Sequence, residues 1–277
     1  MIFLTGDVHH MSLKSNDQKF LSLTEAQLAE KYLQIALDYG IKVTLFISGK
    51  TFVEEPRDIG KLLKYPNLEI GGHTWNCFKP FRLHQLYGLI TSSFCGPYFY
   101  QERDIKKAVS IIERFTGRKC CSWRGHANKY DKNTIKILNK YGVKILSSEL
   151  NPEGKIVKKD GLIVVPINIL PDHSYIYHGH EGLKSQNIGN KLLKRIFFKN
   201  KKLPFGVKIY NVSEWYNLVI EQIELKLQDS GYVCLLIHPV CMEIVDRMET
   251  FKQLCKVISK YNTHFFKDLI NNYAGKI

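Results

Sequence analysis

The strongest constraint on this chain is a repeated order of amphipathic helices and strand-sized apolar runs along its 277 residues. The run Lys42–Ile47 (KVTLFI) is β-branched and apolar, as a buried strand is, and a helix expected over Glu25–Tyr39 precedes it. Strands that alternate with helices favour a parallel sheet. The pattern repeats about seven times, up to a last strand at Tyr232–Ile237, and this number of units favours closure into an α/β barrel over an open sheet.

The other elements follow from the same periodicities. Further strands are expected at Met1–Thr5, Leu68–Ile70, Cys120–Trp123, Val143–Leu146 and Leu162–Ile169, and further helices at Asp104–Phe115, Lys132–Tyr141, Ser213–Gln228 and Thr250–Tyr261. No linker or change in composition divides the chain. We therefore expect residues 1–277 to form a single domain.

Polar residues stand at or just beyond the carboxyl ends of several expected strands: Asp7, His9, His73, Arg124 and His238. In parallel α/β folds, residues at this end of the strands meet at one face, which carries the active site. We therefore expect these five side chains to lie close together.

The residue types suit acid–base and metal-binding chemistry. Asp7 and His9 are two apart in an extended segment and point the same way, which suits a general base beside a metal ligand. His73 and Cys77 both carry donor atoms that zinc prefers, although a buried cysteine is often only a small hydrophobe. His238, at the mouth of an apolar strand and followed by proline, suits an acid or base.

The charge of the chain is +14, from 40 Lys and Arg against 26 Asp and Glu. A solvated cationic surface explains most of it, and an anionic partner is the alternative. The stretch from Gly182 to Ser213 is basic and has no acidic residue, but no recognition motif accompanies it, so specific nucleic-acid binding is not expected. A phosphorylated or uronic-acid glycan would suit this charge equally well.

The cysteine pattern and the apolar runs bear on location. The seven cysteines are odd in number and include no CxxC pair, which favours reduced thiols over a disulfide framework. Met1–Leu4 is too short for the apolar part of a signal peptide, and no apolar run reaches the length of a membrane span. A cytoplasmic protein is expected; the oligomeric state stays open.

Several of these segments, in this order, resemble the polysaccharide deacetylase family, also known for its NodB-homology fold and similar to carbohydrate esterase family 4. Val43–Gly49 (VTLFISG) looks like the family's second strand, and Asp104–Gly117 looks like the helix before its arginine motif. Arg124 matches that arginine, and Leu235–Pro239 (LLIHP) looks like the last motif. The resemblance implies a distorted (β/α) barrel and a metal-dependent hydrolase that removes an acetyl group from an N-acetylated sugar or polysaccharide precursor.

The resemblance also implies the role of each residue. Asp7 would be the general base, held ionised by Arg124, and His238 would be the general acid. A divalent metal, with zinc the expected ion, would be held by His9, His73 and Cys77. A backbone N–H near His126 would help to stabilise the oxyanion.

The metal site departs from the family pattern at two positions. His9 stands where the family has a metal-binding aspartate, and Cys77 stands where it has a second histidine. If Cys77 is only a core residue, the third ligand would be sought at His10, His84 or His173. For the acidic residue that orients His238, Glu149 and Asp172 are both candidates.

Two alternatives stay open at this point. The same fold family includes hydrolases of non-sugar carbon–nitrogen bonds, and a catalytically inactive carbohydrate-binding barrel would explain the changed metal motifs.

Overall fold

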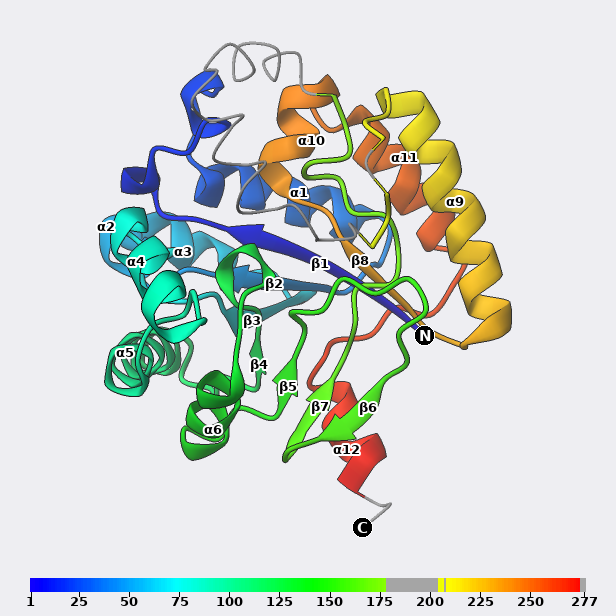
Figure 1. Ribbon diagram of the computed structural model, residues 1–277. Helices are drawn as coiled ribbons and strands as arrows, with labels where there is room; N and C mark the ends of the chain where they lie inside the picture. The colour runs from blue at the N-terminus through cyan, green and yellow to red at the C-terminus, as the bar shows by residue number, and fades with distance from the viewer. Residues whose placement is uncertain (178–203, 207, 275–277) are drawn as a thin grey trace.

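In this computed structural model the chain is described over residues 1–177, 204–206 and 208–274, and its centre is an eight-stranded sheet (Figure 1). The strand order is β6-β7-β5-β4-β3-β2-β1-β8, and β6 alone pairs antiparallel with its neighbour. The strands are β1 (Ile2–Val8), β2 (Val43–Ile47), β3 (Leu68–Gly72), β4 (Ser122–Trp123), β5 (Ile145–Leu146), β6 (Val157–Lys159), β7 (Leu162–Val164) and β8 (Val233–Leu236).

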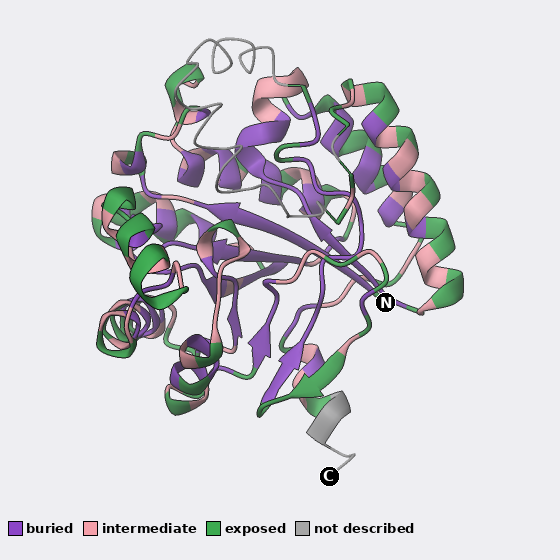
Figure 2. Cartoon of the chain, viewed as in Figure 1, coloured by how far each residue is buried: buried purple, intermediate pink, exposed green. Residues whose placement is uncertain are grey.

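Helices cover the outer face of the curled sheet. Most strand residues are buried, whereas the residues of β6 are exposed (Figure 2). The helices are α1 (Glu25–Asp38), α2 (Thr51–Glu54), α3 (Pro56–Leu62), α4 (Phe81–Thr91), α5 (Tyr98–Thr116), α6 (Lys132–Lys140), α9 (Val212–Asp229), α10 (Pro239–Asp246), α11 (Glu249–Ile258) and α12 (Asp268–Ala274). Short 3-10 turns are η1 (Met11–Leu13), η2 (Gln18–Phe20) and η3 (His126–Asn128). The predicted distorted (β/α) barrel is confirmed in the form of a curled half-barrel.

Local sequence explains where several helices begin and end. Thr24, Asp131 and Asn211 each form a capping box at the start of α1, α6 and α9, which satisfies backbone N–H groups that the helix leaves unpaired. Gly117 ends α5 with a φ of 65°, a left-handed conformation that glycine adopts without a steric penalty.

The structure differs from the sequence prediction at several boundaries. Strand β1 extends to Val8, so that Asp7 lies within the strand and not after it. Helix α5 starts earlier than predicted, at Tyr98, and the strand predicted over 162–169 ends at Val164. Helices α4 and α10 were not predicted; α10 begins at Pro239, where the fixed φ of proline favours the first helical turn.

Alternate residues of each strand face the two sides of the sheet. Ile2, Leu4 and Val8 of β1 pack in the large core under the helices, whereas Phe3 belongs to a second cluster. That second cluster also draws residues from β2, β5, β7, β8 and the C-terminal segment, so it fills the concave interior of the barrel. Thr5 and Asp7 share the side of Phe3, because side chains two apart in a strand point the same way.

One buried side chain bridges the two ends of the curved sheet. Asn168, which follows β7, donates from Nδ2 to the carbonyl oxygen of Tyr232 at 3.1 Å and accepts from the backbone N–H of Cys234 at 2.9 Å. These bonds join the β7 side of the barrel to β8, where backbone pairing does not continue in the sheet order. The side chain of Asn168 thus acts as a polar clasp for the barrel.

Most of the basic stretch from Gly182 to Ser213 lies outside the described residues. Among the helices of the described part, none is long and apolar enough to cross a membrane.

Replacing Asn168 with alanine tests the clasp. Asn168→Ala leaves a buried carbonyl and a buried N–H without their partner, so the free energy of unfolding should fall by about 2–4 kcal/mol. Urea denaturation followed by circular dichroism measures this value. Asn151→Ala, at an exposed position, is the matched control and should cause a much smaller change. Equal stability of Asn168→Ala and the control would show that the barrel does not depend on this contact.

Candidate active site

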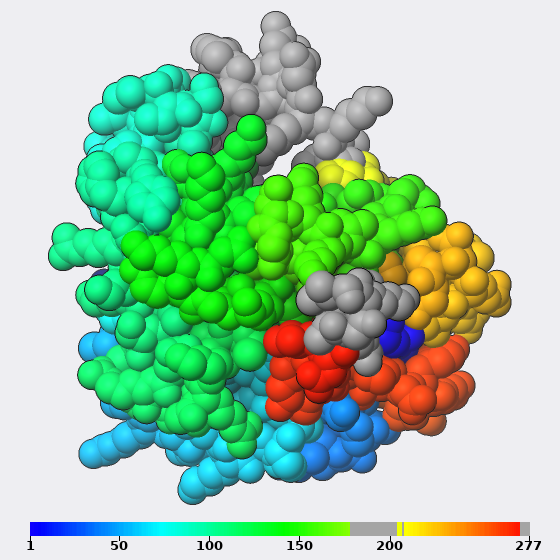
Figure 3. All heavy atoms as spheres, turned by 90° about the horizontal axis from the view of Figure 1, so that it is seen from below, coloured from blue at the N-terminus to red at the C-terminus, as the bar shows by residue number. Residues whose placement is uncertain are grey.

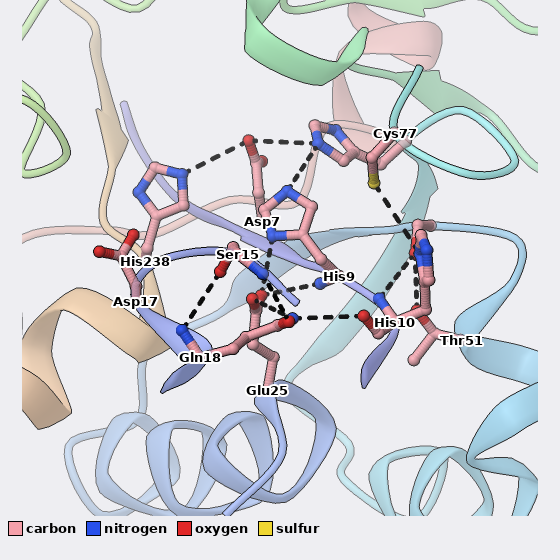
Figure 4. Close-up of polar contacts among 12 residues, drawn as sticks. Asp7, His9, His10, Ser15, Asp17, Gln18, Glu25, Thr51, Cys77 and His238 are labelled. Atoms are coloured by element: carbon pink, nitrogen blue, oxygen red, sulfur yellow. Dashed lines mark hydrogen bonds and ion pairs between the residues drawn. The ribbon is translucent and has the colours of Figure 1, made fainter. Parts of the chain in front are cut away.

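The polar residues predicted to meet do converge at the carboxyl ends of the parallel strands. Asp7 lies near the end of β1, His73 directly follows β3, Arg124 directly follows β4, and His238 lies two residues beyond β8. Figure 4 shows Asp7 between His238 and the imidazole rings around His9. Asp7, His9 and His238 line a cleft of about 850 Å³ with Lys14, Lys79, Phe81, Tyr175 and other residues.

Asp7 and Arg124 form a buried ion pair. Arg124 Nη1 donates to Asp7 Oδ1 at 3.0 Å, and both side chains are almost completely removed from solvent. Burial alone would raise the pKa of Asp7, but the neighbouring His73 and Arg124, together with the contact to His238, hold that pKa well below its usual value. The Asp7 carboxylate is therefore ionised at neutral pH.

The rest of the guanidinium of Arg124 is also fully engaged. Nε donates to the carbonyl oxygen of Ser147 at 2.8 Å, and Nη2 donates to the hydroxyls of Thr5 and Ser147 at 2.9 and 3.0 Å. The group also lies over the ring of Phe46, 4.3 Å from its centroid. These contacts fix the arginine, so it holds one oxygen of Asp7 and leaves the other facing the cleft.

Three imidazoles meet beside Asp7. His9 Nε2 lies 3.2 Å from His73 Nε2, and His126 Nδ1 lies 3.3 Å from the same His73 atom. Asp7 Oδ2 is 3.8 Å from His73 Nε2. His126 was not predicted as a ligand, although it lies two residues after Arg124 and so shares its direction in an extended segment.

The far nitrogens of two of these rings show which atoms carry hydrogen. His9 Nδ1 lies 2.8 Å from the Glu25 carboxylate, and His73 Nδ1 lies 2.9 Å from the carbonyl oxygen of Arg124. Both partners can only accept, so each Nδ1 carries a proton and each Nε2 atom turns to the other ring. Burial would lower the pKa of His9, but the charge and hydrogen bond of Glu25 outweigh burial and raise that pKa. Burial lowers the pKa of His73 to about 3, which favours its neutral form.

Two ring nitrogens that face each other at this distance need either a proton on one of them or a cation between them. Two nitrogen ligands bonded at about 2.0–2.1 Å to a tetrahedral zinc ion lie about 3.3–3.4 Å apart, close to the separations observed around His73 Nε2. A proton could join one pair of rings, whereas one metal ion would satisfy all three. The residues therefore fit a divalent metal, and Glu25 has the position of the carboxylate that orients a metal-bound histidine.

Cys77 lies at the edge of this cluster. Its Sγ falls within 4.8 Å of ligand atoms of His9 and His126, and 4.0 Å from His10 Nδ1. The segment after His73 is not helical, because Thr74, Cys77 and Phe78 all have positive φ angles of 56–59°. Such angles in non-glycine residues are costly and occur mainly where function or packing requires them.

The three alternative ligands considered from the sequence lie elsewhere. His10 contacts the Ser48 hydroxyl at 3.1 Å, and His84 is buried among aromatic rings with Nδ1 on the carbonyl oxygen of Phe94. His173 is half-exposed beside Cys241 and Asp17 on the side of His238.

His238 is oriented by Asp172. The Asp172 carboxylate accepts from the ring Nδ1 of His238 at 2.7 Å and from its backbone N–H at 2.6 Å. Of the two candidates from the sequence, Glu149 instead accepts from the hydroxyl of Tyr130. The other ring nitrogen, Nε2, lies 3.6 Å from Asp7 Oδ2.

The same contacts set the protonation of His238. Burial lowers its pKa, but the charge and hydrogen bond of Asp172 and the nearby Asp7 outweigh burial and raise it to about 10. The ring is therefore protonated at neutral pH. An ionised carboxylate and a protonated imidazole thus face the same space, as acid–base chemistry requires.

The family model of the polysaccharide deacetylases matches residues 14–146, a range that contains His73, Cys77, Arg124 and His126. Asp7, His9 and His238 lie outside that range. No curated protein sequence matches the chain.

Solved structures similar to this chain include three that differ in activity. A protein of Mycobacterium smegmatis assigned to the polysaccharide deacetylases has a TM-score of 0.69 and 13% identity, with coverage of 100% of this chain and 91% of that one. The allantoinase PuuE has a TM-score of 0.63 and 8% identity, over 96% of this chain and 86% of that one. BA3943, a CE4 family pseudoenzyme from Bacillus anthracis, has a TM-score of 0.52 and 12% identity, over 97% of this chain and 64% of that one.

At these identities the similarity concerns the fold alone, and the fold is that of the NodB-type barrels. The family match over residues 14–146, together with this fold, makes the chain similar to the polysaccharide deacetylases.

Proposed function

We propose that this chain is a metal-dependent hydrolase that removes the acetyl group from an N-acetylated sugar or polysaccharide precursor. The observation that carries the proposal is the convergence of three imidazole nitrogens beside the ionised Asp7, with the protonated His238 on the other side. The family match over residues 14–146 supports deacetylase activity in general. The metal dependence and the sugar substrate belong to the proposal.

His9, His73 and His126 would hold the metal, and Cys77 is close enough to add a fourth ligand. This set keeps His9, His73 and Cys77 from the sequence prediction and adds His126. Zinc suits nitrogen and sulfur donors. When bound, the ion would polarise the acetyl carbonyl and lower the pKa of a water molecule.

Asp7 would act as the general base. Arg124 holds Oδ1, so Oδ2 is left to accept a proton from the attacking water on the side of His73. His238 would act as the general acid and protonate the amine as the carbon–nitrogen bond breaks, which yields acetate and a free amino sugar. The backbone N–H near His126 is the proposed donor to the oxyanion.

Two alternative functions can be separated from this proposal by experiment. A non-sugar carbon–nitrogen bond as substrate is supported by the fold shared with an allantoinase, and an inactive carbohydrate-binding barrel by the fold shared with a pseudoenzyme. A screen of N-acetylated sugars, nucleotide sugars and cyclic amides separates the first from the proposal. Turnover of any of them contradicts the second.

We also propose that residues 1–277 act as one catalytic domain in the cytoplasm. All seven cysteines are free thiols, six of them buried, which supports a reducing compartment. The excess of positive charge favours an anionic glycan as substrate.

The first prediction concerns the metal ligands. Elemental analysis of purified protein should find stoichiometric zinc or another divalent metal. His73→Ala should lose it, because that ring contacts both other imidazoles, and His126→Ala should lower metal content more than Cys77→Ala. If Cys77→Ala loses the metal and His126→Ala retains it, the ligand set is His9, His73 and Cys77 instead.

The second prediction separates the base from the ligands. Asp7→Asn should abolish turnover and leave metal content unchanged, because the amide keeps the shape of Asp7 but cannot take a proton at neutral pH. The matched control is Asp17→Asn, at a second buried aspartate that lines the same cleft. Loss of metal from Asp7→Asn, with metal retained in the control, would make Asp7 a ligand.

The third prediction concerns His238 and Asp172. His238→Ala should lower kcat by about 10²–10⁴-fold, the usual contribution of a positioned acid, with metal retained. Asp172→Asn removes the main attraction that raises the pKa of His238, so the proton is lost at lower pH. The alkaline limb of the rate–pH profile should therefore move to lower pH. If Asp172→Asn keeps the wild-type rate–pH profile, His238 is not the acid.

A further inference from the structure

Helix α4 exposes an apolar stripe where a surface helix normally carries polar residues. Leu86, Leu89 and Ile90 lie at helical spacing, and their exposed fractions are 49%, 66% and 72%. The opposite face of α4 is apolar as well: His84 and Tyr87 pack against the rings of Phe94 and Tyr100. A helix with apolar residues on two opposite faces is normally covered on both.

The exposed apolar surface extends beyond α4. Phe81 at its start is 57% exposed, and Phe99 at the start of α5 is 72% exposed. Figure 3 shows the cyan and teal part of the chain, which includes α4, as a protrusion at the edge of the molecule. We call the residues Phe81, Leu86, Leu89, Ile90 and Phe99 the α4 patch. Exposed apolar residues gathered on neighbouring elements in this way are typical of contact sites.

The charges around the α4 patch all have one sign over a long segment. From Lys79 to Gln101 the sequence contains no acidic residue, and its charged residues are Lys79 and Arg82. Arg103 and Lys106 follow as exposed residues on α5, interleaved with the less exposed Glu102 and Asp104. Glu102 is paired with Lys140, and Asp104 accepts from the backbone N–H of Trp75. The whole chain has a net charge of +14. An apolar surface with a basic border complements an anionic lipid surface, into which the apolar side chains insert while the cations meet the headgroups.

The α4 patch is also continuous with the cleft. Phe81 and Lys79 belong to the lining of the cleft that contains Asp7 and His238. The Lys79 ammonium donates to the carbonyl oxygen of Leu13. This bond joins the part of the cleft lining next to the α4 patch to the loop that follows β1. A surface that contacts the α4 patch therefore lies next to the mouth of the cleft.

We propose that the α4 patch docks this protein on the surface of an anionic lipid bilayer, as a peripheral contact without a membrane span. Docking would hold the cleft beside the headgroup region. The inference concerns binding and does not depend on the chemistry proposed for the cleft.

Vesicle binding of the full chain tests this proposal. Wild-type protein should sediment with vesicles of phosphatidylcholine and phosphatidylglycerol in equal parts, and bind pure phosphatidylcholine vesicles more weakly. The double variant Leu89→Glu, Ile90→Glu should bind the anionic vesicles at least about 100-fold more weakly, because it removes two large apolar side chains and adds two anions. Arg82→Glu should reduce binding about fivefold or more through charge alone.

Leu225→Glu is the matched control, because Leu225 is 56% exposed on α9. It should bind vesicles as the wild type does, and circular dichroism of every variant should match the wild type. The proposal is overturned if the wild type does not bind anionic vesicles, or if Leu225→Glu weakens binding as much as the double variant. A wild-type dimer in sedimentation equilibrium that the double variant converts to a monomer, without vesicle binding, would assign the α4 patch to a second copy instead. Activity on a soluble substrate plays no part in these outcomes, so failure here leaves the proposed function untouched.

Discussion

The buried pair of Asp7 and Arg124 is the contact on which the active site depends. Its two residues come from β1 and β4, and the remaining guanidinium nitrogens bond Thr5 in β1 and Ser147 beyond β5. A buried arginine is tolerated only when its charge and its hydrogen-bond donors are matched. Here each guanidinium nitrogen bonds a residue in a strand or just beyond one, so satisfying the arginine also fixes the separation of these strands. The free oxygen of Asp7 then faces both His73 and His238.

The orientation of three histidines near the cleft depends on the hydrogen-bond acceptor at each Nδ1. Glu25, the carbonyl oxygen of Arg124 and Asp172 each accept from the Nδ1 of one ring, namely His9, His73 and His238. In each case the acceptor decides which nitrogen faces the cleft. The outcome differs with the charge nearby: His73, which is deeply buried, stays neutral, whereas His238 lies between two carboxylates and keeps its proton. In the proposed mechanism, similar rings thus serve as ligand and as acid.

The similar structures explain why the fold alone leaves the activity open. One barrel shape is shared with a protein assigned to the polysaccharide deacetylases, an allantoinase and a pseudoenzyme. In this chain the family's aspartate and second histidine are replaced by His9 and Cys77, and His126 brings a third imidazole to the same place. Although two motif positions differ, the ligand atoms near His73 still suit a metal. The reason is that the barrel brings the turn after β4 beside the end of β3.

The sequence by itself determined the parallel order of strands and helices and the meeting of Asp7, Arg124, His73 and His238 at one end of the sheet. These follow from periodicity, since the carboxyl ends of parallel strands share one edge. The helices α4 and α10 could not be predicted, because Pro80 and Pro239 read equally well as the end of one element or the start of the next. Only the tertiary structure decided that Asp172 and not Glu149 orients His238, that His126 joins His9 and His73, and that Glu25 holds His9. Each of these contacts joins residues whose distance depends on how far the sheet curves, and that curvature comes from packing in three dimensions.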